Sequence, residues 1–274
     1  MAYLTLADRQ YTAPSAAAGV TLTLSGVDWG DSAYGELVAA VDADCILTGI
    51  TVASWSSSLA SYEYEVDIAT GGAGSESVIA TFRGEQRQVI SNVTTDGMYL
   101  PAGIGIDNIA NGDRLSARVR GGTTATHTVN IAVTYLKKPL TGSTLTTAQP
   151  LLTLPPAQDD FSFAMGTSWA WGSWFELSPD TRPEAIVITT LIFPTPAATM
   201  DIELQLGTAV GGDVTVLTTV RASMEGTSSN PYIYPLPNAL DNVPALTSFV
   251  ARARYQGTTA RSMLLAINYF NKPL

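Results

Sequence analysis

The sequence is poor in charged side chains, and lysine is the scarcest of them. Charged residues make up 14% of the 274 residues, against a usual share of about 25% in soluble proteins. The chain holds three lysines, Lys137, Lys138 and Lys272, and its formal net charge is −10. Phosphate binding depends on clustered Lys and Arg, so the composition argues against a nucleic-acid partner. A surface with so little charge is expected to be covered by neighbouring proteins, and we expect a homo-oligomer, with a trimer as one arrangement.

Cysteine and histidine occur once each, which limits the chemistry. The single Cys45 excludes an intramolecular disulfide, and its place at the entry to an apolar segment predicts a small buried side chain. One cysteine and one histidine, His127, exclude the usual zinc ligand sets. His127 has no counterpart in the second half, where Arg261 lies near the matching position, so a repeated Ser-His-Asp site is excluded. The loop from Asp107 to Asp113 holds oxygen ligands for calcium, but a turn rich in Asx residues explains it better. We expect no catalytic residue, no bound metal and no cofactor.

Long apolar runs are also missing. No stretch approaches the roughly 18 consecutive apolar residues of a membrane-spanning helix. Residues 1–20 lack both a basic start and a continuous apolar stretch, so we expect no signal peptide, no membrane partner and synthesis in the cytoplasm. The 23 glycines and 15 prolines are too frequent for long helices. These features predict a folded chain that consists mostly of β-strands.

An internal repeat organises the sequence. Ala117-Arg118-Val119-Arg120 returns as Ala251-Arg252-Ala253-Arg254, and the segment 135–140 returns as 269–274, both at an offset of 134. Trp29-Gly30 is matched here with Trp171-Gly172 at an offset of 142. The change in offset indicates small loop insertions between two copies of one domain. We predict an N-terminal arm over 1–18, a first domain over 19–140, a linker over 141–159 and a second domain over 160–274.

Within each copy, apolar and polar residues alternate with a period of two. The segments 62–68, 129–135 and 201–206 are examples, and clusters of Gly, Asn and Asp separate them. Such short alternating runs predict strands that turn one face to a core. We therefore predict an all-β chain of two tandem jelly-roll-like β-sandwich domains. An immunoglobulin-like sandwich is the alternative, because alternation does not give the order of the strands.

Aromatic side chains gather densely in one segment only, which contains Trp169, Trp171, Trp174 and Phe175. Exposed tryptophans can stack on sugar rings, so Trp169, Trp171 and Trp174 are candidates for contact with a glycan. Core packing is the competing interpretation, because Trp169, Trp171 and Phe175 alternate along what can be a strand. No other group of side chains suggests a binding site.

The first copy resembles a known family of domains. A glycine-rich turn precedes Ser-Glu and a strand within Val66 to Ile79, and a proline-containing strand follows at Tyr99 to Gly103. A Gly-x-Arg-hydrophobic-x-x-Arg segment lies within Gly112 to Arg120. This pattern resembles a β domain that recurs in virion proteins of tailed bacteriophages. The second copy departs from it at Gly211 to Val214 and at Thr247 to Phe249, so its membership rests on the repeat.

The resemblance implies a structural role in a virion, without an enzymatic activity. Domains of this type are building blocks in heads, collars and tails. A capsid decoration or a fibre-like accessory would bind a major capsid, collar or tail protein through its arm and its sandwich surfaces. The alternative is a receptor-binding adhesin that recognises a host surface glycan.

Overall fold

The computed structural model describes residues 10–14, 19–54, 62–86, 94–99, 104–138, 146–147, 151–154, 161–178, 185–195, 200–224 and 232–271. These residues form strands and turns, and none of them lies in a helix. No helix that could span a membrane is therefore found in this part of the chain. The chain divides into unit 1, Met1–Leu152 with Pro273, and unit 2, Thr153–Lys272 with Leu274. The predicted domain boundaries stay predictions.

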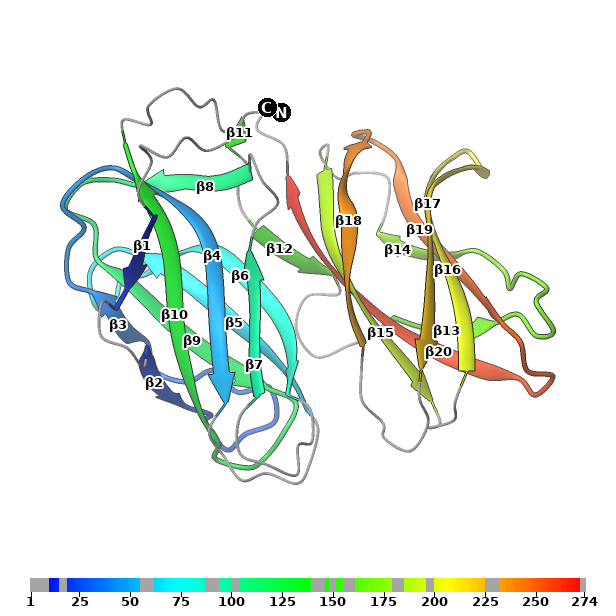
Figure 1. The fold of residues 1–274 in the computed structure, drawn as a ribbon, viewed down its shortest axis with the longest axis horizontal. Helices are drawn as coiled ribbons and strands as arrows, with labels where there is room; N and C mark the ends of the chain where they lie inside the picture. The colour runs from blue at the N-terminus through cyan, green and yellow to red at the C-terminus, as the bar shows by residue number, and fades with distance from the viewer. Residues whose placement is uncertain are drawn as a thin grey trace. The chain divides into compact units, whose positions relative to one another are not determined.

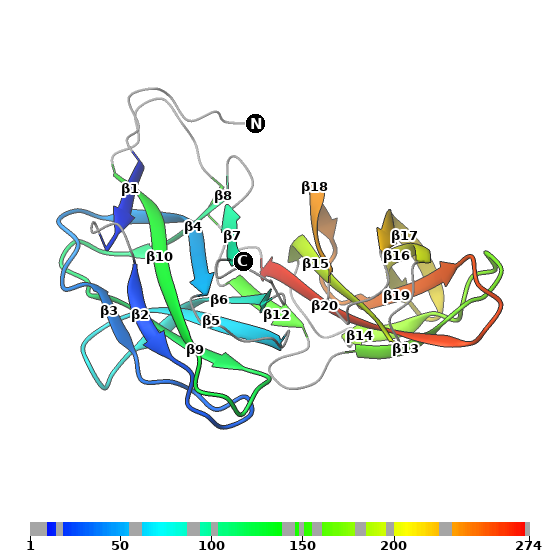
Figure 2. The ribbon, with the colours of Figure 1, turned by 60° about the horizontal axis from the view of Figure 1, so that its bottom comes forward.

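Unit 1 consists of two antiparallel sheets that face each other (Figures 1 and 2). In one sheet, β10 pairs with β4 on one side and with β1 and β2 on the other, and β4 also pairs with β7 and β8. The other sheet has the order β3-β9-β5-β6. The strands are β1 (Gln10–Ala13), β2 (Val20–Thr23), β3 (Gly35–Val38), β4 (Cys45–Ser54), β5 (Tyr62–Thr70), β6 (Ser77–Gln86), β7 (Thr94–Tyr99), β8 (Ile104–Ile109), β9 (Leu115–Gly121) and β10 (Thr128–Lys137).

The pairing in unit 1 is nested, and this nesting defines the topology. From the outside inwards, β2 pairs with β10, β3 with β9, β4 with β7 and β8, and β5 with β6. Such a long antiparallel hairpin, rolled up so that its strands alternate between two sheets, is a jelly roll.

Unit 2 repeats this nested pairing, with the single strand β18 in the place of β7 and β8. β13 pairs with β20, β14 with β19, β15 with β18, and β16 with β17. The strands are β13 (Phe161–Met165), β14 (Phe175–Ser178), β15 (Ala185–Thr195), β16 (Met200–Val210), β17 (Asp213–Met224), β18 (Tyr232–Val243), β19 (Ser248–Tyr255) and β20 (Arg261–Asn271). The prediction of an all-β chain with two tandem jelly rolls is therefore confirmed.

The cores follow from the alternation seen in the sequence. In unit 1, Val66, Ile68, Val119, Ile131 and Val133 are fully buried between the sheets. The core of unit 2 contains the following apolar side chains: Phe163, Met165, Leu177, Met200, Ile202, Leu204, Leu206, Val220, Phe249, Ala251, Ala253, Tyr255, Met263, Leu265 and Ile267. Every second residue of a strand points to the same face, so the residues between these positions form the outer faces of the sheets.

The predicted arm and the predicted linker each contain residues that pair with strands of unit 1. Residues 10–13 of the predicted arm form β1, and the Tyr11 ring stacks on that of Tyr135 with 5.8 Å between centroids. In the predicted linker, β11 (Thr146–Thr147) pairs with β8, and Leu151 in β12 (Leu151–Leu154) pairs with Ala80 of β6. Alternation over four residues or fewer, close to Thr- and Pro-rich sequence, is too short to predict such strands.

Candidate functional site

The outer face of the β3-β9-β5-β6 sheet in unit 1 carries a dense group of charged side chains. Arg118 and Arg120 alternate with the buried Ala117 and Val119 along β9, so both arginines lie on the outer face. In the register of the sheet, Arg118 lies beside Asp67 of β5 and Arg120 beside Glu65. The strand register alone therefore places each arginine of β9 next to a carboxylate of β5, without any contribution from a loop.

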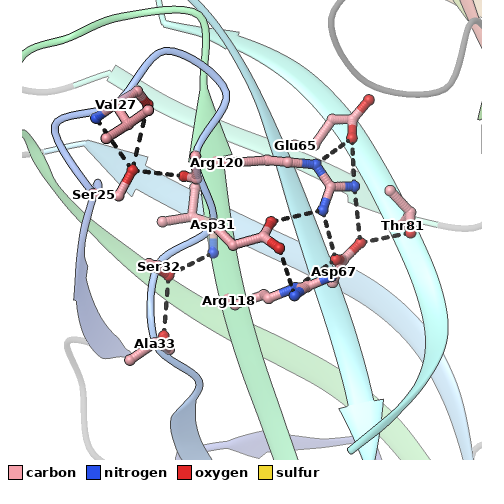
Figure 3. Close-up of polar contacts among 12 residues, drawn as sticks. Ser25, Val27, Asp31, Ser32, Ala33, Glu65, Asp67, Thr81, Arg118 and Arg120 are labelled. Carbon is pink, nitrogen blue, oxygen red and sulfur yellow. Dashed lines mark hydrogen bonds and ion pairs between the residues drawn. The ribbon is translucent and has the colours of Figure 1, made fainter.

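Ion pairs connect these side chains to each other and to a loop (Figure 3). Arg118 donates from Nε to Asp67 at 2.8 Å and from Nη1 to Asp31 at 2.7 Å. Arg120 contacts Glu65 at 2.6 Å, Asp67 at 2.9 Å and Asp31 at 3.1 Å. Asp31, in the loop between β2 and β3, thus bridges both arginines, while Glu65 and Asp67 are buried beneath them. Burial alone would lower the pKa of Arg120, but Asp67 and Glu65 raise it above its ordinary value.

A third arginine extends the group onto β6. Arg83 is 1% exposed and forms an ion pair with Glu63, to which its Nε donates at 2.8 Å. Its guanidinium lies 5.0 Å from the ring centroid of Trp29. The backbone N–H of Trp29 donates to Gly121 at 2.8 Å, and Trp29 has a left-handed φ of 55°. The loop between β2 and β3 is thus held over the sheet by the backbone and ring of Trp29 and by the ion pairs of Asp31.

The same positions of unit 2 carry the same three arginines. Arg252 and Arg254 lie on β19, and Arg221 lies on β17. Arg254 contacts Glu203 at 2.6 Å, as Arg120 contacts Glu65. Arg221 is 65% exposed and reaches Asp201 only at 4.0 Å.

Arg252 differs from its counterpart Arg118. Its neighbour in register is Gln205, whose Oε1 accepts a hydrogen bond from the Arg252 Nε at 2.8 Å. Burial lowers the pKa of Arg252, and the neighbouring Arg254 adds to this effect.

Three tryptophans cover the arginines of unit 2. The Trp169 ring lies 5.4 Å from Arg221 and 5.8 Å from Arg254. Trp171 follows at 4.2 Å from Arg254 and 4.8 Å from Arg252, and Trp174 lies 4.4 Å from Arg252. Guanidinium groups and indole rings thus alternate in one continuous series, which we call the tryptophan–arginine ladder. Each such contact contributes about 0.5–1 kcal/mol where it is exposed to solvent.

The structure corrects the alignment of the two loops. Trp169, and not Trp171, is the counterpart of Trp29, because its N–H donates to Tyr255, which corresponds to Gly121, at 3.0 Å. Trp169 also has the same left-handed φ, 61°. Sequence comparison was wrong here because a Trp-Gly pair is a weaker signal than the backbone contacts that fix the loop.

The corrected alignment gives a position-by-position comparison of the loops. Trp171 takes the position of Asp31, and Trp174 takes that of Tyr34, whose ring lies 5.0 Å from Arg118. A bridging carboxylate of unit 1 is thus replaced by an indole ring that contacts the same two arginine positions.

The candidate glycan residues Trp169, Trp171 and Trp174 are therefore brought together on one surface. All three are half-buried, so the structure does not place them in the core. Trp169 and Trp171 precede β14, and Phe175, the first residue of that strand, stacks on Phe163 with 5.4 Å between centroids. Glycan contact by these residues stays a prediction.

The arginines of the ladder were missed in the sequence. The repeated Ala-Arg-x-Arg segment was the signal, since a period of two puts both arginines on one face.

Other residues considered in the sequence take structural positions. Cys45 is fully buried, and burial raises the pKa of its thiol to about 11. In the loop after β8, the Asp113 carboxylate accepts a hydrogen bond from the Ala110 N–H at 2.8 Å, so it closes the turn between these residues. Burial lowers the pKa of His127. Among the described residues, no group of three His, Cys, Asp or Glu side chains could hold a metal ion.

No protein-family model matches the sequence, and no curated protein matches it either. Solved structures match at low similarity. A triple jelly-roll turret protein of an archaeal virus is 7% identical, with a TM-score of 0.26 over 98% of this chain. This chain spans 61% of the length of that protein.

Two further structures match over most of both chains. The infectious bursal disease virus Gt strain structure is 15% identical, with a TM-score of 0.29 over 97% of this chain and 72% of that one. A tandem CBM22 domain from Paenibacillus barcinonensis is 9% identical, with a TM-score of 0.26 over 100% and 93%. At these scores the jelly-roll assignment rests on the strand pairing of this chain itself.

Proposed function

We propose that this protein is a non-enzymatic structural component of a tailed-phage virion, as a decoration or fibre-like accessory on the head or collar. The proposal rests on the charged residues of the segments that resemble the phage domain, Val66 to Ile79 and Gly112 to Arg120. Arg114 pairs with Glu76 at 3.2 Å, and both Arg118 and Arg120 pair with Asp67. The charged residues of that pattern bind each other across strands, so their role is to hold the sheet together.

Composition supports the same proposal. Only 14% of the residues are charged, against a usual share of about 25%, and we infer that part of the surface is covered by neighbouring proteins. The partners would be a major capsid, collar or tail protein and further copies of this chain. Two similar jelly rolls per chain would let a trimer present six similar domains.

Immunogold labelling of intact phage particles, viewed by electron microscopy, tests the proposal. Label over the head or collar is expected, and antibody absorbed with the purified protein is the control. Particles without label would contradict a place in the virion. Label at the tail tip would favour the alternative function.

The alternative is a receptor-binding adhesin for a host surface glycan. The half-exposed Trp169, Trp171 and Trp174 favour it, because aromatic rings and arginines are common contacts of sugars. Trp174→Ala would then abolish binding on a glycan array while unit 2 stays folded. Tyr34→Ala at the matching position of unit 1 is the control and would leave sugar binding unchanged.

The N-terminal arm gives a second test of the structural role. β1 belongs to the sheet of unit 1, so the deletion must end before it. Removing residues 1–9 is expected to reduce binding to particles that lack the protein, while both units keep their circular dichroism spectrum. Unchanged binding would exclude the arm from attachment.

A further inference from the structure

Arg252 differs from the other described arginines of the two equivalent sheet faces. Arg83, Arg118, Arg120, Arg221 and Arg254 each form an ion pair with a carboxylate. Among the described residues, Arg252 forms none, and its one hydrogen bond runs from Nε to the amide of Gln205. Its two terminal nitrogens therefore have no hydrogen-bond partner in that part of the chain.

Unit 1 shows what this position binds when a carboxylate is within reach. Arg118, the counterpart of Arg252, contacts Asp67 beside it on β5 and Asp31 in the loop above it. Unit 2 lacks both carboxylates, since Gln205 stands where Asp67 does and Trp171 where Asp31 does. The equivalent arginines of the two units thus differ, because Arg118 binds two carboxylates and Arg252 binds none among the described residues.

The surroundings keep the Arg252 guanidinium in place. The rings of Trp171 and Trp174 lie 4.8 and 4.4 Å from it, and Gln205 holds its Nε. Gln205 is itself oriented, because its Nε2 donates to Thr219 at 3.2 Å. A planar guanidinium that is already fixed loses little entropy when its terminal nitrogens bind a carboxylate.

We propose that Arg252 is a docking site for an aspartate or glutamate side chain of a partner protein. The inference rests on the proposed structural role, for which it names the chemistry of the partner. A protein carboxylate is favoured over an acidic sugar for two reasons. Arg118 already binds such carboxylates, and the Arg252 guanidinium lies over the rings of Trp171 and Trp174, which leaves less of each ring for stacking on a sugar.

Short peptides test the site in solution without virions. The intact ¹⁵N-labelled protein is titrated with a blocked pentapeptide that has one central aspartate between glycines, and with the same peptide carrying asparagine. The readout is the indole N–H signals of the tryptophans in a ¹H–¹⁵N spectrum. The aspartate peptide is expected to shift the Trp171 and Trp174 signals saturably at millimolar concentration, and added salt should weaken the effect.

Gln205→Asp is the decisive variant. It gives unit 2 the carboxylate that unit 1 carries in the same register, so Arg252 becomes neutralised from within the fold. The apparent affinity for the aspartate peptide should fall at least about tenfold, which corresponds to roughly 1.4 kcal/mol. Thr215→Asp adds the same charge at an exposed position of β17, which β16 separates from β19, and should leave the affinity within about twofold.

Three results would overturn the proposal. The first is that the aspartate and asparagine peptides shift the indole signals equally. The second is that the Gln205→Asp variant binds the aspartate peptide as tightly as the unchanged protein does. The third is that an oligogalacturonate binds saturably whereas the aspartate peptide does not bind. The last result would assign the site to an acidic glycan. Because no particle enters the experiment, failure of the site and failure of the virion assignment are distinguishable.

Discussion

Units 1 and 2 share a topology and three arginine positions, yet they neutralise those arginines by different means. In unit 1, Asp31, Glu65 and Asp67 compensate Arg118 and Arg120. In unit 2, indole rings cover Arg221, Arg252 and Arg254, and among the described residues Glu203 and Asp201 are the carboxylates that pair with them. The sheet framework is therefore independent of the choice between carboxylates and rings, and the outer face can change while the fold is kept.

The largest expected effect comes from removing the central cation of each face. Arg120→Met leaves Glu65 and Asp67 buried with less compensation and should destabilise unit 1 by about 3–5 kcal/mol. Arg254→Met leaves the more accessible Glu203 and should cost unit 2 about 1–2 kcal/mol. Hydrogen exchange followed by mass spectrometry in a urea series gives both values in the intact chain.

The buried Cys45 checks this result independently, since its thiol can be labelled only when unit 1 opens. Labelling should accelerate in the Arg120→Met variant and stay unchanged in Arg254→Met. Equal losses of stability in the two units would show that the carboxylates and the rings are equivalent.

An intermediate effect is expected from exchanging the bridging residue. Trp171→Ala removes contacts to two guanidinium groups and should cost unit 2 about 1–2 kcal/mol. Trp171→Asp should recover part of that loss, because an aspartate at the matching position of unit 1 pairs with both arginines. Asp31→Ala is the reciprocal variant, and unfolding in urea measures all three. No recovery by aspartate would mean that the two loops hold their backbones differently.

The smallest effect concerns acid. Hydrogen bonds, the first from its own backbone N–H and others from Arg114 and Gly74, hold the pKa of Glu76 below its usual value. A depressed pKa in the folded state contributes stability above the unfolded value of about 4.3, and the contribution is lost as the pH falls through the folded pKa. The protection of the backbone amides in the turn between β5 and β6 against hydrogen exchange should therefore fall as the pH is lowered from about 5 to about 3, because Glu76 becomes protonated in the folded state over this range.

The control for this titration is Glu76→Gln, which should make the protection of that turn nearly independent of pH over the same range. The matching hairpin of unit 2 turns over two glycines, Gly211 and Gly212, and its carboxylate, Asp213, forms no ion pair with an arginine among the described residues. A pH response of the same size there would remove Glu76 as the cause in unit 1.

The repeated strands could be predicted from the sequence, because alternation reports the local period of a strand and the shared offset of 134 reports the repeat directly. It did not predict the ladder, since Trp169 and Arg254 meet across 85 positions of the chain. It also mispaired Trp29 with Trp171, because short loops tolerate insertions that shift a small motif. The strands β1 and β12 were missed, because four residues carry too little pattern to separate a strand from a turn.

The nested pairing also has a consequence for how the chain reaches its fold. The outermost pair of the nested strands in unit 1, β2 and β10, meets through Thr21 and Asn130, which are 109 positions apart. A sandwich closed by such distant segments folds slowly, since loop closure precedes most of the stabilising contacts. During synthesis, unit 1 has all its strands before those of unit 2 are made, so the two similar sequences are separated in time, which limits mispairing between them.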